Sequence, residues 1–137
     1  MKQCVLIQKK KIAAALLDKP IQGKRQLEPL KSLFLAKKIP FTIIEDCNVN
    51  KTEAEVHKQE GDLICCLEGK ITFVYGGKLV DPWTRDGSDG NELGGHDIRN
   101  GTSVILKPGD WLWIPPHQPH LHKTSGVARM ILAKIRA

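Results

Sequence analysis

The stretch EVHKQEGDLICCLEG, residues 55–69, changes from polar to apolar partway along. Glu55 and His57 are two residues apart, so in a strand their side chains share one face. A turn signal at Gly61 comes before an apolar run, and the stretch closes at Gly69. This pattern predicts two short strands joined by a turn, with a carboxylate and an imidazole side by side on the first.

Short β-like runs continue through the chain after residue 40. Turn residues separate most of them, and no helical pattern alternates with them, which argues against a parallel α/β sheet. Many short strands at close spacing predict a mainly all-β protein, built as a sandwich or a small antiparallel barrel. The expected strands cover residues 41–45, 54–57, 62–68, 71–76, 78–80, 102–107, 110–115, 119–123 and 126–135.

The glycine-rich segment 81–101, DPWTRDGSDGNELGGHDIRNG, interrupts this series. It has little periodicity, and a loop of this length inside a compact domain is usually functional or mobile. We expect a long excursion between two strands, which is either a lid or a surface insertion.

The first 40 residues differ from the rest of the chain in charge. They hold ten basic and two acidic residues, whereas residues 41–137 hold eleven and thirteen. Apolar spacing from residue 27 predicts a helix that ends before Pro40, and IAAALLD predicts a shorter helix before Pro20. The residues between the helices, 19–26, are expected to be loop. We therefore divide the chain into a basic N-terminal extension with one or two short helices, residues 1–40, and a β-barrel domain, residues 41–137.

The composition narrows the class of protein. A chain of 137 residues is about one domain, and it has no apolar run of membrane-spanning length. The first residues lack the cleavage pattern of a signal peptide. The cysteines have no metal-binding or disulfide-framework spacing and are expected to be buried, reduced thiols, so we expect a cytoplasmic protein. They are Cys4, Cys47, Cys65 and Cys66.

The basic extension raises the question of nucleic-acid binding. Its one aromatic residue, Phe34, cannot form the stacking platform that single-strand binders use. We expect a solvated lysine-rich face and no nucleic-acid partner.

Two stretches resemble the sequence motifs of the cupin superfamily. The first motif is G(X)5HXH(X)3–4E(X)6G. Gly69 matches its final glycine, and Asp62 stands where the family has glutamate. His57 takes the place of the second histidine, and Glu55 stands where the first should be. The opening glycine is absent, since position 49 is Val49.

The second motif, G(X)5PXG(X)2H(X)3N, is matched by GDWLWIPPHQPHLHKT. Gly109, Pro115 and His120 are in register, whereas His117 replaces the motif glycine and Thr124 replaces the asparagine.

The resemblance covers residues 41–135. It implies a cupin-like antiparallel β-barrel, the double-stranded β-helix or jelly roll, that binds a metal. Small cupins are commonly dimers, so the resemblance also implies a homodimer.

The set His57, Asp62 and His120 has two imidazoles and one carboxylate. This is the composition of the facial triad that holds non-haem iron. Glu55 can add a fourth, oxygen ligand, and Glu60 competes with it for that role. Such a set also accepts Mn, Ni, Zn or Cu, so the ligand types predict a divalent transition metal without deciding which one. The absence of a thiolate argues against a structural zinc site.

Further residues are candidates for a substrate pocket around this set. One lies on the strand face of His120 and another on that of Asp62, and two lie in the glycine-rich segment. The candidates are His122, Cys66, Tyr75, Trp83 and Arg85.

Two functions follow as expectations. The first is a metal-dependent enzyme, dioxygenase-like or isomerase-like, that acts on a small oxygenated organic substrate. The second is a non-catalytic cupin that binds a sugar or an organic acid. The replacement of a motif histidine by Glu55 makes the second reading credible. Catalytic residues beyond the metal set are not assigned.

Overall fold

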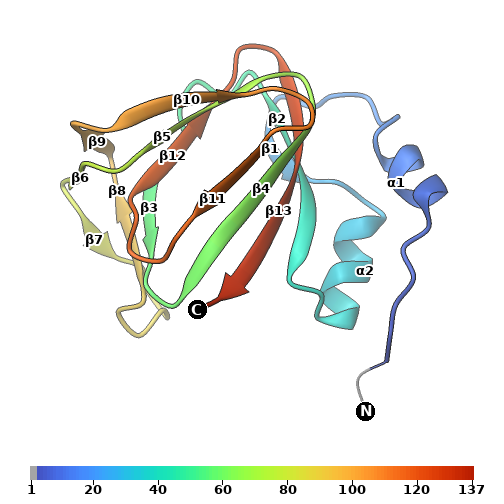
Figure 1. Ribbon diagram of the computed structural model, residues 1–137, viewed down its shortest axis with the longest axis horizontal. Helices are drawn as coiled ribbons and strands as arrows, with labels where there is room; N and C mark the ends of the chain where they lie inside the picture. The colour runs from blue at the N-terminus through green and yellow to red at the C-terminus, as the bar shows by residue number, and fades with distance from the viewer. Residues whose placement is uncertain (1–2) are drawn as a thin grey trace.

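The computed structural model describes residues 3–137 and contains two short helices outside a β-barrel (Figure 1). In this range no helix is both long enough and apolar enough to cross a membrane. The helices lie together on one side of the barrel, next to its C-terminal strand and the strand that follows the second helix. They are α1 (Lys9–Ala15) and α2 (Leu30–Lys37).

The barrel is made of two antiparallel sheets, which confirms the predicted mainly β fold. The five-stranded sheet has the order β1 (Gly23–Gln26), β2 (Phe41–Cys47), β13 (Val127–Arg136), β4 (Glu60–Glu68), β11 (Trp111–Ile114). The six-stranded sheet has the order β10 (Thr102–Leu106), β5 (Ile71–Tyr75), β12 (His120–Lys123), β3 (Ala54–His57), β8 (Glu92–Gly95), β7 (Trp83–Thr84). A third, two-stranded sheet pairs β6 (Lys78–Val80) with β9 (Asp97–Arg99).

Strand β2 is buried on both faces, and this joins the helices to the barrel. Ile44 packs inside the barrel, whereas its neighbour Ile43 packs under the helices with Leu30 and Phe34. Alternate residues of a strand point to opposite faces, so one strand serves two cores. The predicted apolar stripe of the second helix is thus confirmed at Leu30 and Phe34, while Ala36 is exposed.

A buried charge network also connects the N-terminal extension to the barrel. Glu45 is fully buried on β2 and accepts hydrogen bonds from Arg25 Nε and Arg129 Nη2, both at 2.7 Å. Arg129 also donates to the carbonyl oxygens of Leu16 and Asp18, beyond the end of α1. Removing one partner from such a network leaves an uncompensated buried charge, so it fixes the extension on the sheet.

Two expectations for the loops were wrong. Residues 23–26, expected to be loop, form the edge strand β1, which pairs antiparallel with β2. The stretch is polar because its edge position leaves only one neighbour strand, and its ladder of backbone hydrogen bonds needs no apolar alternation. The shorter helix also lies earlier than expected, at residues 9–15.

The second wrong expectation is the long excursion at residues 81–101. Nine of its 21 residues are in strands, because β8 pairs with β3, β7 pairs with β8 and β9 pairs with β6. The glycines of β8, Gly94 and Gly95, are required by packing, and this hid the strand pattern. A Cβ atom on Gly94 would lie 2.5 Å from Trp83 Cε2, so only glycine lets the indole cross the strand.

Candidate metal centre

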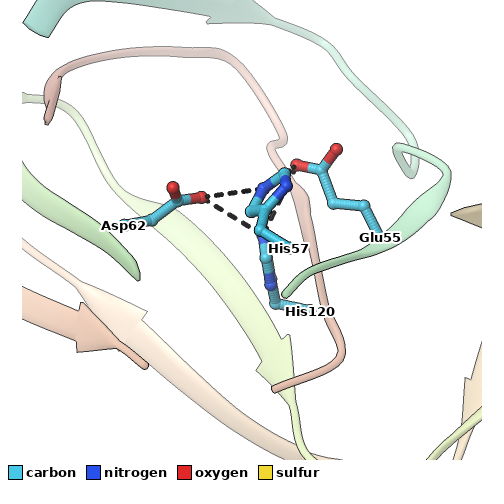
Figure 2. A group of neighbouring side chains, drawn as sticks. All are labelled: Glu55, His57, Asp62 and His120. Carbon is cyan, nitrogen blue, oxygen red and sulfur yellow. Dashed lines mark ion pairs between the residues drawn. The ribbon is translucent and has the colours of Figure 1, made fainter. Parts of the chain in front are cut away.

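Four side chains converge inside the barrel from both sheets. Glu55 and His57 come from β3, His120 from β12 and Asp62 from β4. Figure 2 shows the two imidazoles between the two carboxylates. One nitrogen or oxygen atom from each residue lies within 4.8 Å of the others, and a group of this composition can hold a metal ion.

The distances show how evenly the group is arranged. The Nε2 atoms of His57 and His120 are each 3.3 Å from Asp62 Oδ2. The same two nitrogen atoms are 3.6 and 3.4 Å from Glu55 Oε1. His57, Asp62 and His120 are buried, and Glu55 is half-buried.

Strand register brings these residues together. His120 is the register partner of Glu55 across the β12–β3 pair. His57 is two residues beyond Glu55 and therefore shares its face. The chain then turns from the six-stranded into the five-stranded sheet, so that Asp62 on β4 faces the other three from the opposite wall.

His120 carries the observation that most directly indicates a ligand. Its Nδ1 atom is 3.0 Å from the carbonyl oxygen of Gln118. A carbonyl oxygen only accepts, so Nδ1 donates and the lone pair is on Nε2. That Nε2 atom is buried and has no hydrogen-bond partner among the residues that the structure describes. Such an unpaired buried atom is costly, and a metal ion is the partner that would satisfy it.

His57 is oriented by a carboxylate. Its Nδ1 atom donates a hydrogen bond to Glu92 Oε2, across the β3–β8 pair in which the two residues are register partners. Metal-binding histidines usually make this kind of second hydrogen bond, which fixes the ring and makes the ligating nitrogen more basic. The residues present therefore fit a metal ion.

The electrostatic field of the group favours a cation. Burial would raise the pKa of Glu55 and Asp62, but the neighbouring imidazoles outweigh it and hold both pKa values well below their usual range. Burial lowers the pKa of His57, and contacts with Asp62 and Glu55 outweigh it and raise the pKa to about 10, while the Lys134 ammonium opposes them. The pKa of His120 is also raised by the two carboxylates. The two carboxylates thus make this position favourable for positive charge, and a metal ion would replace the protons on the imidazole nitrogens when it binds.

A cavity of about 770 Å³ opens on this group. Glu55, His57, Arg85 and Lys134 line it near the metal-binding group, and it continues past Leu132 toward α2. Arg85 Nη1 is 2.9 Å from Glu55 Oε2, so an ion pair holds this ligand from the cavity side.

Comparisons with known proteins report on the fold. No protein-family model and no curated protein matches the sequence. The cupin domain of Drosophila melanogaster CENP-C is similar, with a TM-score of 0.51 and 10% identity over 72% of this chain and 58% of that chain. The protein has a cupin fold.

Two further structures resemble this chain. Drosophila melanogaster CENP-C bound to CAL1 gives a TM-score of 0.50 and 9% identity, over 69% of this chain and 60% of that chain. An oxalate oxidase gives 0.49 and 15% identity, over 70% and 41%. The chain thus spans about half the length of the structures that it matches.

The cupin motif positions that depart from the family pattern have clear structural roles. His117, at the motif glycine, has a positive φ of 70°. Its backbone N–H donates to the carbonyl oxygen of His57 at 2.8 Å and so connects the two motifs. Thr124, at the motif asparagine, accepts a hydrogen bond from the N–H of Val49 at 3.1 Å. Position 49 is where the first motif would begin.

The predicted pocket residues are in different places. Arg85 lines the cavity and contacts Glu55, as described above. His122 is buried with its Nδ1 atom 2.5 Å from Asp46 Oδ2. Cys66 belongs to the apolar core. Trp83 lies against His96, with ring centroids 5.1 Å apart.

The remaining alternatives are also placed by the structure. Tyr75 on β5 is half-buried and is the register partner of His120 on the side of β12 away from β3. Glu55 is in the four-residue group, whereas Glu60 lines the cavity and is not part of that group.

Sequence reasoning missed three residues next to the ligands. Glu92 lay in a segment expected to be loop, so it had no predicted register with His57. Gln118 acts through its backbone carbonyl, which no side-chain pattern reveals. Lys134 could have been found, because it shares one face of the expected strand 126–135 with Met130 and Leu132.

Proposed function

We propose that this cupin barrel binds one divalent transition metal and is a metal-dependent enzyme acting on a small oxygenated organic substrate. The ligands would be Glu55, His57, Asp62 and His120. The single observation that carries the proposal is the buried Nε2 atom of His120, which has no hydrogen-bond partner within residues 3–137 and faces two carboxylates and a second imidazole.

The donor set restricts the metal. Two imidazole nitrogens and two carboxylate oxygens suit Fe, Mn, Ni or Zn. When bound, such an ion supplies Lewis acidity or, for iron, redox chemistry with oxygen, which agrees with dioxygenase-like or isomerase-like reactions.

The protein's own residues have distinct tasks in this proposal. Glu92 and the Gln118 carbonyl hold the two imidazoles with their Nε2 atoms toward the two carboxylates, together with which they would hold the metal. Arg85 holds Glu55 and also faces the cavity, where its guanidinium can donate to oxygen atoms of a substrate. The barrel walls remove the site from bulk water and so strengthen each of these electrostatic contacts.

A non-catalytic function is the second candidate, in which the barrel binds a sugar or an organic acid. It is favoured by the ion pairs that already balance both carboxylates, Arg85 with Glu55 and Lys134 with Asp62. Because these side chains neutralise the carboxylates, the barrel can stay folded without a metal in the site.

Metal analysis separates the two functions. The chain is expressed without an affinity tag that binds metals, purified without chelators and analysed by mass spectrometry for transition metals. We expect close to one metal ion per chain, and none in His57→Ala/His120→Ala. The control is His96→Ala, because His96 packs against Trp83 in a tilted arrangement and is outside the four-residue group. Folded, metal-free natural protein that also fails to take up added metal would contradict the enzyme proposal and favour the binding module.

We further propose that the protein is a homodimer in a reducing compartment such as the cytoplasm. Support for a second copy comes from β11, an edge strand of the five-stranded sheet that exposes 62% of Trp111 and 46% of Trp113. Open strand edges and large exposed aromatic side chains favour association. In a two-fold symmetric dimer, one interface would bury the β11 edge of both copies. Support for the compartment comes from Cys47, Cys65 and Cys66, which are free and buried. The expectation of burial was wrong for Cys4, which is free and exposed.

A further inference from the structure

One cation of the chain itself already contacts the metal-binding group. Lys134 lies on β13 as the register partner of Asp62 on β4. Its Nζ atom is 2.7 Å from Asp62 Oδ1 and 3.1 Å from His57 Nε2. The side chain is one-third exposed, at 33%, and lines the cavity beside the group. The ammonium therefore reaches two of the four ligands from the cavity side.

One of these contacts is to an atom that a metal would use, His57 Nε2, and the other is to the Asp62 carboxylate, whose second oxygen, Oδ2, faces the two imidazoles. Because Nδ1 donates to Glu92, the neutral form of His57 carries its lone pair on Nε2, and an ammonium group, which has three donors and no acceptor, engages that lone pair. One lone pair cannot serve both an ammonium and a metal ion. A positive charge this close would also repel a divalent cation, because the interior screens charges far less than water does.

We propose that Lys134 is a displaceable internal cation, which neutralises the group without metal and must leave when a metal binds. This inference rests on the proposed function. In this inference, the Lys134 ammonium competes with the metal ion for the ligands and so sets the affinity of the site for metal. The metal-free barrel avoids the cost of adjacent buried carboxylates, because one of them already has an ion-pair partner.

A displaced ammonium has another carboxylate within the same cavity. Glu60 is two residues before Asp62 on β4 and therefore shares its strand face. It lines the cavity together with Lys134. Moving from Asp62 to Glu60 keeps the lysine paired and leaves its positive charge at the cavity wall, where an anionic substrate group would meet it.

The test is the affinity of the metal-free protein for Zn²⁺, measured by calorimetry at one neutral pH and one ionic strength. Lys134→Met keeps the apolar stem and removes the charge, and we expect it to bind Zn²⁺ about tenfold more tightly or better. Lys134→Gln removes the charge but can still donate to Asp62, so it serves if the Met variant does not fold, and it should change affinity in the same direction. Lys24→Met is the matched control, because this lysine lines the same cavity but is not an ion-pair partner of the four ligands in the described residues.

Each outcome has a defined meaning. Tighter binding by the Lys134 variants with unchanged Lys24→Met supports the competitor. Zn²⁺ binding by the variants but not by the natural protein supports the competitor and contradicts the proposed metalloenzyme. Equal or weaker binding by folded variants, with normal binding by the natural protein, overturns the competitor alone. Absence of binding by every form overturns both proposals.

Discussion

His57 and Glu92 are register partners across the β3–β8 pair, and the imidazole Nδ1 donates to the Glu92 carboxylate. This hydrogen bond directs the opposite ring nitrogen toward Asp62 and His120. The segment that contributes Glu92 is thus part of the wall that builds the site, rather than a loop above it.

Replacing Glu92 tests this orienting role. We expect Glu92→Ala to lower metal affinity by about 10–100-fold, since carboxylates behind ligating histidines typically contribute this much. Competition with a metal-chelating dye measures the change. Glu53→Gln is the control, because the Glu53 carboxylate is exposed and its ion pair with Arg85 is long, at 3.9 Å. Unchanged affinity in Glu92→Ala would show that packing alone orients His57.

Gly69 closes the first motif and tests backbone packing. It has a φ of +70°, and a Cβ there would lie 2.0 Å from the Val127 carbonyl oxygen. We expect Gly69→Ala to lower the free energy of unfolding by about 2 kcal/mol or more, from left-handed strain plus this clash.

Gly87 is the matched control for Gly69, because its φ is +76° and no atom of the described residues lies within 4 Å of an added Cβ. Gly87→Ala should cost only about 1 kcal/mol, the strain alone. Urea denaturation measures both, and equal costs would show that the clash at Gly69 is relieved by a small shift of the backbone.

Glu45 makes stability depend on pH. Burial would raise its pKa, but Arg25 and Arg129 outweigh it, so the folded-state pKa lies below the unfolded value. A lowered pKa means that the stabilisation is complete above the unfolded-state pKa and is lost as pH falls through the folded-state value. We expect Glu45→Gln to cost about 3 kcal/mol at pH 7, since it removes the buried carboxylate that neutralises the buried Arg129 guanidinium at 2.7 Å.

The cost of Glu45→Gln should shrink in acid, where the natural carboxylate is protonated too. Urea denaturation at neutral and acidic pH measures the difference. Glu68→Gln is the control, because Glu68 contacts the same arginine, Arg129, at 3.6 Å but is 44% exposed. A pH-independent cost for Glu45→Gln would contradict the prediction.

The proposed dimer predicts a change of mass. Light scattering should find the natural chain at twice its mass of 15.3 kDa. Trp111→Lys should shift it toward the monomer by placing a charge on the open edge of β11. Leu17→Lys, at an 84% exposed leucine of the N-terminal extension, should leave the mass unchanged. A monomer mass for the natural chain would contradict the proposed dimer.

Local patterns were sufficient for much of the barrel. The expected strand at residues 54–57 is observed with the same limits, and that at 78–80 likewise. Alternation and turn residues determine such strands because both act over a few neighbouring positions. Pattern reasoning failed at β1 and β8, whose polar or glycine-rich residues are held by backbone pairing with distant strands.

The sequence by itself determined which residues can serve as ligands, because side-chain chemistry and two-residue spacing are local: Glu55 and His57 had to share a face of any strand that contained them. Only the tertiary structure decided that Asp62 approaches from the opposite sheet, that Glu92 stands behind His57, and that Lys134 contacts two of the ligands. Those contacts depend on the register between strands far apart in the chain, and register is set by the packing of the whole barrel.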